Sequence, residues 1–164
     1  MLRILLIVTL FFQPIIPMAQ RDEFKPKHST ILDASKGPKL MEQCSRAVPK
    51  DISNFWTLSE KDIDLLQRNL KKVLTINSKT CCSTGSRVSN LKDFAFQYVG
   101  VEIKNNRYIY LNAFSFDKEE DLTTFYKNWK SEPLIFCDGG KSFWGALFDP
   151  TELGFSELAI NGVG

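Results

Sequence analysis

Apolar residues near the end of the chain predict an antiparallel pair of strands. Phe143–Phe148 is apolar on both of its faces, which is typical of a strand that is covered on both sides. A turn signal begins at Asp149-Pro150, and Phe155–Ile160 follows it, so we predict that this segment returns as the partner strand. Gly145, in the interior of the first strand, indicates a bulge or a close approach by another group.

Helical spacing occurs in two places. Ser59 with Asp62 three residues later is typical of a capping box at the start of a helix. An apolar stripe with helical periodicity follows: Ile63, Leu66, Leu70 and Val73. A second helix is predicted over Asp117–Lys130, with Pro133 as its stop signal.

Between the two predicted helices, Phe94–Phe114 alternates in the way that two paired strands do. Asn105-Asn106 lies at its centre, and asparagine tolerates the left-handed backbone that a two-residue hairpin turn of type I′ needs. With that turn, Val101 would face Tyr110 across the hairpin. The element order is then helix, hairpin, helix, hairpin, which predicts an α+β fold with two helices packed on one four-stranded antiparallel sheet.

The first residues of the chain predict an export signal. Residues 1–19 carry one positive charge, a mostly apolar run over Ile4–Ile16 and a small residue at Ala19. This pattern is typical of a secretory signal peptide that is cleaved between Ala19 and Gln20. We therefore expect an exported protein, periplasmic or secreted, with no membrane span in its mature chain.

Behind the signal peptide, the predicted domain organisation has two parts. Residues 20–52 are mostly polar and show little periodicity, so we predict a leader that is partly flexible and loosely docked. Residues 53–164 form the single α+β domain. The chain holds 21 basic and 19 acidic residues. This balance gives no electrostatic reason to expect a nucleic acid or an anionic membrane as partner.

Four cysteines are present: Cys44, Cys81, Cys82 and Cys137. Export permits disulfides, and four cysteines allow three complete pairings. A bridge between the adjacent Cys81 and Cys82 would close a strained ring, so we favour pairing of one or both of them with Cys44 or Cys137. Zinc is the alternative, but the spacing lacks two CxxC pairs and no histidine is close. We predict neither a metal nor another cofactor.

His28 is the only histidine, and it lies in the polar leader. A Ser-His-Asp or Cys-His mechanism needs an imidazole within hydrogen-bond reach of the nucleophile. Those mechanisms are therefore excluded unless the leader folds back into a cleft.

Aromatic and turn residues supply the candidate binding sites. Tyr108, Tyr110 and Asn112 share one face of a predicted strand, so they form either an exposed recognition row or part of the core. Trp56 is a further aromatic candidate for stacking or anchoring. Asp138 beside two glycines either binds a cation or a substrate hydroxyl, or caps its own turn.

Several short motifs also carry a resemblance. They are Phe55-Trp56-Thr57 before a helix, Tyr98-Val99-Gly100-Val101, Tyr108-Ile109-Tyr110, and Asp138-Gly139-Gly140 with Ser142-Phe143-Trp144-Gly145. Together they resemble small exported bacterial proteins of unassigned function, and the order of helices and strands is loosely similar to cystatin-type folds. The resemblance implies no catalytic residue, and fold alone does not set function.

These observations predict an exported protein that works by binding, with a protein or cell-envelope ligand in the periplasm or outside the cell. The alternative is a small hydrolase of cell-wall or polysaccharide substrates that uses carboxylates around Asp138 and Glu157, with Asn161 orienting the substrate. Two carboxylates hydrolyse a glycosidic bond only when they lie about 5–10 Å apart. The positions of these side chains therefore discriminate between the two hypotheses.

Overall fold

A computed structural model describes residues 23–79 and 83–163. The predicted signal peptide, its cleavage site and the cysteine pair Cys81-Cys82 lie outside the described residues.

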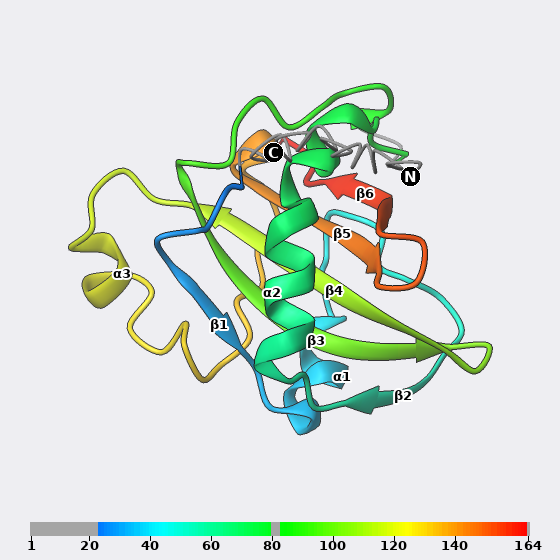
Figure 1. Ribbon diagram of the computed structural model, residues 1–164. Helices are drawn as coiled ribbons and strands as arrows, with labels where there is room; N and C mark the ends of the chain where they lie inside the picture. The colour runs from blue at the N-terminus through cyan, green and yellow to red at the C-terminus, as the bar shows by residue number, and fades with distance from the viewer. Residues whose placement is uncertain (1–22, 80–82, 164) are drawn as a thin grey trace, which may run out of the picture.

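Within the described residues, six strands form one mixed sheet (Figure 1). They are β1 (Ser29–Ile31), β2 (Ile52–Trp56), β3 (Phe94–Ile103), β4 (Asn106–Ser115), β5 (Phe143–Asp149) and β6 (Gly154–Ile160). The order is β1-β3-β4-β5-β6, and β2 also pairs with β3. β1 runs parallel to β3 beside Phe96–Tyr98, whereas β2 runs antiparallel beside Gly100–Ile103. The two short strands therefore share one edge of β3, one after the other.

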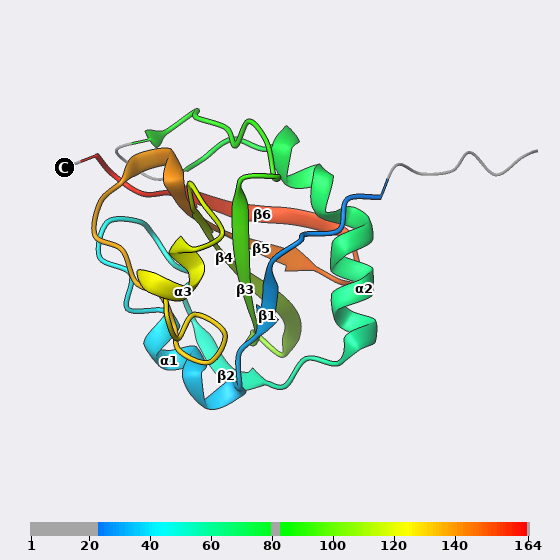
Figure 2. The ribbon, with the colours of Figure 1, turned by 90° about the vertical axis from the view of Figure 1, so that its left-hand side faces the viewer.

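The longest helix, α2 (Glu60–Asn69), packs across one face of the sheet and continues as a 3₁₀ segment over Leu70–Thr75 (Figures 1 and 2). The predicted capping box is confirmed: Ser59 Oγ accepts from the Asp62 N–H, and the Asp62 carboxylate accepts from the Ser59 N–H. The other helical elements that lie wholly within the described residues are short: α1 (Gly37–Leu40), α3 (Asp121–Thr124), and 3₁₀ turns at Ala34–Lys36 and Gly140–Ser142.

The predicted architecture of two helices on a four-stranded antiparallel sheet is wrong in two respects. The sheet is larger and mixed, because two further strands pair with β3: β1 in the predicted leader and β2 at the start of the predicted domain. The helix predicted over Asp117–Lys130 shrinks to the single turn of α3. Helical spacing would place Phe125 on the buried face of that helix with Leu122 and Trp129, but its side chain is 78% exposed. The hydroxyls of Thr123 and Thr124 donate to the Glu120 carbonyl, a local bond that competes with regular helix.

The β3–β4 hairpin forms, but with a different turn and register. Its two turn residues are Lys104 and Asn105, with φ of 51° and 65°, as a type I′ turn requires. Val101 therefore faces Tyr108, and the predicted pairing of Val101 with Tyr110 is wrong by two residues. Lys104, Asn105 and Asn106 are all polar, so either adjacent pair of them could form the two-residue turn, and the sequence alone left its centre uncertain by one position.

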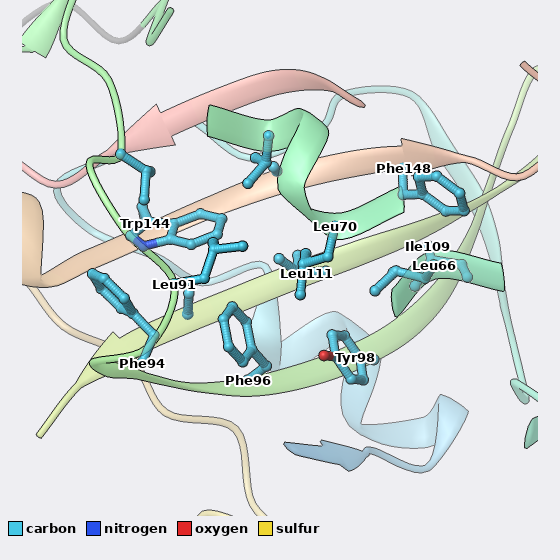
Figure 3. Close-up of a cluster of buried hydrophobic side chains, with 14 of the residues drawn as sticks. Leu66, Leu70, Leu91, Phe94, Phe96, Tyr98, Ile109, Leu111, Trp144 and Phe148 are labelled. Atoms are coloured by element: carbon cyan, nitrogen blue, oxygen red, sulfur yellow. The ribbon is translucent and has the colours of Figure 1, made fainter. Parts of the chain in front are cut away.

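The sheet is buried on both faces. Under α2 lies the largest apolar cluster, in which Trp144 is fully buried between the strands and the helix (Figure 3). The other face holds two smaller apolar clusters, one around Leu32 and Leu40 and one around Phe114 and Trp129. The prediction that Phe143–Phe148 is a strand covered on both faces is confirmed. Among the described residues, no helix is both long and apolar enough to cross a membrane.

The segment expected to be a loose leader is packed onto the sheet in its described part. His28 accepts a backbone hydrogen bond from Phe96, and Leu32 donates one to Tyr98. Leu32 is also buried. The stretch from β1 to β2 therefore covers the face opposite α2, and this is where the polar residues described next are gathered.

Candidate functional site

A row of buried amides crosses the face of the sheet opposite α2. Gln97 pairs with Asn112 across β3 and β4. The Gln97 side chain accepts from Asn112 Nδ2 at 2.8 Å and from the Leu134 N–H at 3.0 Å. It also donates to the carbonyls of Trp129 and Glu132. These bonds satisfy every polar group of Gln97 and fasten the segment after α3 to the middle of the sheet.

Arg46 is the charged member of this buried network. Its guanidinium donates to Asn161 Oδ1 at 2.9 Å, to Tyr110 Oη at 3.4 Å and to Asn112 Oδ1. The residue is only 6% exposed, and its Nε has no hydrogen-bond partner. No carboxylate in the described part of the chain forms an ion pair with it. A full positive charge is therefore buried among neutral acceptors, which is an unusual and costly arrangement.

A disulfide holds this network in place. Cys44, two residues before Arg46, is bonded to Cys137. The expectation that Cys81 or Cys82 pairs with one of these two cysteines is wrong, because Cys44 and Cys137 pair with each other. Asn161 continues the connection by donating to the carbonyls of Phe136 and Asp138 at 2.8 and 3.0 Å.

Next to the network lies an open groove of about 380 Å³. The segment that follows Arg46 forms one side, and β3, β4, β5 and β6 form the other. The lining residues are Ala47, Val48, Pro49, Lys50, Ile103, Tyr108, Leu147, Ser156 and Glu157. Leu147 is buried in the floor, whereas Lys50, Ser156 and Glu157 are exposed at the rim. The groove thus combines an aliphatic floor, one phenol and two charged side chains.

The rim owes its shape to a bulge in β6. The pairing of β5 with β6 shifts between Gly145 and Leu147, and Glu157 has a φ of 51°, which is uncommon for a residue other than glycine. A bulge re-aims side chains and leaves the extra residue out of the regular ladder. The Glu157 carboxylate lies 3.4 Å from Lys79 Nζ. Lys50, by contrast, forms no ion pair with any described residue.

A second hollow, of about 620 Å³, also touches Ser156 and Glu157 and extends along Ile76–Lys79 to Thr84 and Gly85. Residues 80–82, which follow Lys79 in the sequence, lie outside the described residues. We therefore place the candidate site in the groove beside Arg46.

The predicted recognition row of Tyr108, Tyr110 and Asn112 divides between the groove and the buried network around Arg46. Tyr108, Tyr110 and Asn112 share one face of β4, but only Tyr108 reaches the groove. Tyr110 and Asn112 are about 1% exposed and belong to the buried network. Trp56 is not among the described residues that line the groove or bond to Arg46: its indole N–H donates to the Val101 carbonyl at 3.2 Å, and the Arg107 guanidinium lies over its ring.

The carboxylates of the hydrolase hypothesis are not assembled around one cavity. Glu157 lines the groove, whereas Asp138 does not. Asn161, which that hypothesis expects to orient the substrate, is buried. Both the oxygen and the nitrogen of its amide are hydrogen-bonded within the protein. His28 lies elsewhere, edge-on to Phe116. Within residues 23–79 and 83–163, no three histidine, cysteine or acidic side chains gather in a way that would hold a metal ion.

Sequence reasoning missed Arg46 and Lys50, because nothing in the local pattern of the polar N-terminal stretch distinguishes them. Gln97 did have a detectable signal: it is the one polar residue in the otherwise apolar run from Phe94 to Val101. Comparison of the chain with protein-family models, with characterised proteins and with solved structures yields no match. The resemblance to small exported bacterial proteins therefore stays a prediction.

Proposed function

We propose that this protein is a non-catalytic binding protein that acts in the periplasm or outside the cell, and that the groove beside Arg46 holds its ligand. Two features support export: the signal-peptide pattern of residues 1–19 and a disulfide, which persists in oxidising compartments. The ligand is a protein segment or a component of the cell envelope.

The groove itself is the observation that carries the proposal. Its volume of about 380 Å³ falls within the usual range for sites that bind small molecules or short segments. It places a half-buried tyrosine ring, Tyr108, beside an aliphatic floor and charged rim residues. Tyrosine supplies both contact area and a hydrogen-bonding hydroxyl at little cost in conformational entropy.

The wall of this groove is anchored at the point where it begins. Residues Ala47–Lys50 follow directly after the disulfide at Cys44 and the buried side chain of Arg46. A wall that is rigid before the ligand arrives loses little entropy on binding. This preorganisation favours a binding role. Glu157 is the one carboxylate among the described residues that line the groove, which disfavours the hydrolase.

The test is a nuclear magnetic resonance titration of the disulfide-oxidised protein with a panel of short peptides, carboxylic acids and cell-wall oligosaccharides. We expect chemical-shift changes confined to Ala47–Lys50, Ile103–Tyr108 and Ser156–Glu157. Tyr108→Ala should weaken the binding of the retained ligand by at least tenfold, whereas Phe125→Ala, which removes an exposed ring just after α3, should leave it unchanged. Shifts only at other sites, or cleavage of an oligosaccharide, would overturn the proposal.

A further inference from the structure

Within the described part of the chain, the groove lining holds one basic side chain, Lys50, and one acidic side chain, Glu157, and the two differ in their ion pairing. Lys50 is exposed at the rim and has no ion-pair partner among the described residues. Glu157 is the one carboxylate among the lining residues, and Lys79 already lies 3.4 Å from it. An anionic group of a ligand can therefore reach Lys50 without meeting an uncompensated negative charge.

Arg46 is a second positive charge on this face of the sheet. Its partner Tyr110 is two positions along β4 from the groove residue Tyr108, a distance of roughly 7 Å at 3.3 Å per strand residue. Buried charges are screened far less than exposed ones. Since the guanidinium donates only to neutral oxygens, no carboxylate bonded to it among the described residues cancels its charge.

Resting on the proposed function, we infer that the ligand is the carboxyl terminus of a peptide whose last side chain is aliphatic. The terminal carboxylate pairs with the Lys50 ammonium. The last side chain lies on the floor at Leu147, between Val48 of the wall and Ile103 of β3.

The rim of the groove distinguishes a peptide from a fatty acid, which presents the same carboxylate and aliphatic chain. An acyl chain is best held in an enclosed apolar cavity, whereas this groove is open and has polar rim residues. The Ser156 hydroxyl, the Tyr108 phenol and the bulged backbone at Glu157 line it. These groups match the amide groups of a peptide.

The decisive experiment compares two probes that differ only in charge: N-acetyl-Ala-Ala-Leu as the free acid and as its carboxamide. Both are titrated into the disulfide-oxidised protein and followed by nuclear magnetic resonance. We expect the acid to bind at least tenfold more tightly than the amide, with shifts at Lys50 and Tyr108. Raising the salt concentration should weaken the binding of the acid and leave the binding of the amide nearly unchanged.

Lys50→Gln should remove most of the difference between the binding of the acid and that of the amide. Lys61→Gln is the matched control, because Lys61 is an exposed lysine on α2, which covers the opposite face of the sheet. Thermal unfolding of both variants confirms that they are folded. A Lys50→Gln protein that still prefers the acid tenfold would overturn the assignment of the carboxylate to Lys50.

Other outcomes separate this inference from the proposed function. Equal binding of acid and amide in the groove, or tighter binding of octanoate than of the peptide acid, overturns the inference but leaves a groove-binding protein. If neither peptide binds while an oligosaccharide or a cationic ligand occupies the groove, the inference fails alone. If nothing in the panel binds the groove, both fail.

Discussion

The phenol of Tyr110 lies against the bare Cα of Gly145. A Cβ atom on residue 145 would come within 2.4 Å of the Tyr110 phenolic oxygen. Tyr110 is fully enclosed and its hydroxyl is held by Arg46, so the ring has no room to move aside. The prediction that Gly145 marks a close approach by another group is thereby confirmed.

Gly145→Ala should therefore destabilise the protein by about 1–3 kcal/mol, the usual cost of overpacking a core. Chemical denaturation gives this free energy of unfolding. The matched control is Gly154→Ala on β6, where the nearest atom to an added Cβ is 3.9 Å away. The steric explanation fails if the two variants lose the same stability.

Arg46→Met should destabilise the fold by about 2–4 kcal/mol, because it leaves the buried oxygens of Asn112 and Asn161 without their donor. Arg107→Met is the control, since Arg107 is exposed and lies over the Trp56 ring; there we expect a loss below about 1 kcal/mol. Urea unfolding measures both values. Equal stability of Arg46→Met and the parent protein would contradict a structural role for the network.

Replacing both Cys44 and Cys137 with serine should lower the free energy of unfolding by about 2–5 kcal/mol, as expected for a bridge that closes a long loop. The two cysteines are 93 positions apart. Denaturation of the double variant and of the parent under oxidising conditions measures the difference. Reduction of the parent with a thiol should reproduce the loss, and a parent insensitive to reduction would argue against this bridge.

The ion pair of Glu132 with Lys36 should make the stability of the fold depend on pH. The Lys36 ammonium donates to the Glu132 carboxylate at 2.5 Å and holds its pKa below the usual 4.5. Because the unfolded chain regains the ordinary pKa, the ion pair contributes stability above about pH 4.5 that is lost as pH falls through the lower folded-state pKa. Carbon-detected titration should give a Glu132 pKa below 4.5 that rises in Lys36→Met. It should stay unchanged in Lys92→Met.

The elements that could be predicted from the sequence are those whose signals are local. The Ser59–Asp62 box and the apolar stripe behind it define α2, and continuous burial defines β5. β1 could not be predicted, because three residues carry no periodicity and their pairing partner, β3, lies far along the chain. The extent of α3 was overestimated, since Phe125 fits a helical stripe but points to solvent.

The candidate site was predictable only in part. Tyr108 was identified by its position on an alternating strand, but the same alternation places Tyr110 in the core. Which of the two is exposed depends on the segment from Leu32 to Lys50 that covers them. That segment is held by a disulfide and by Arg46, and such long-range contacts leave no local pattern in the sequence.

The shared edge of β3 has a consequence for the order of folding. β3 and β4 are joined by a two-residue turn and can pair early, whereas β1 must arrive from the far N-terminal side and run parallel. Closing so long a loop is slow. Until β1 and β2 arrive, β3 has an open row of backbone donors and acceptors, which is a template for strands of other chains. By pairing with β3, β1 and β2 cover that edge, and a protein shortened before β2 should aggregate more readily.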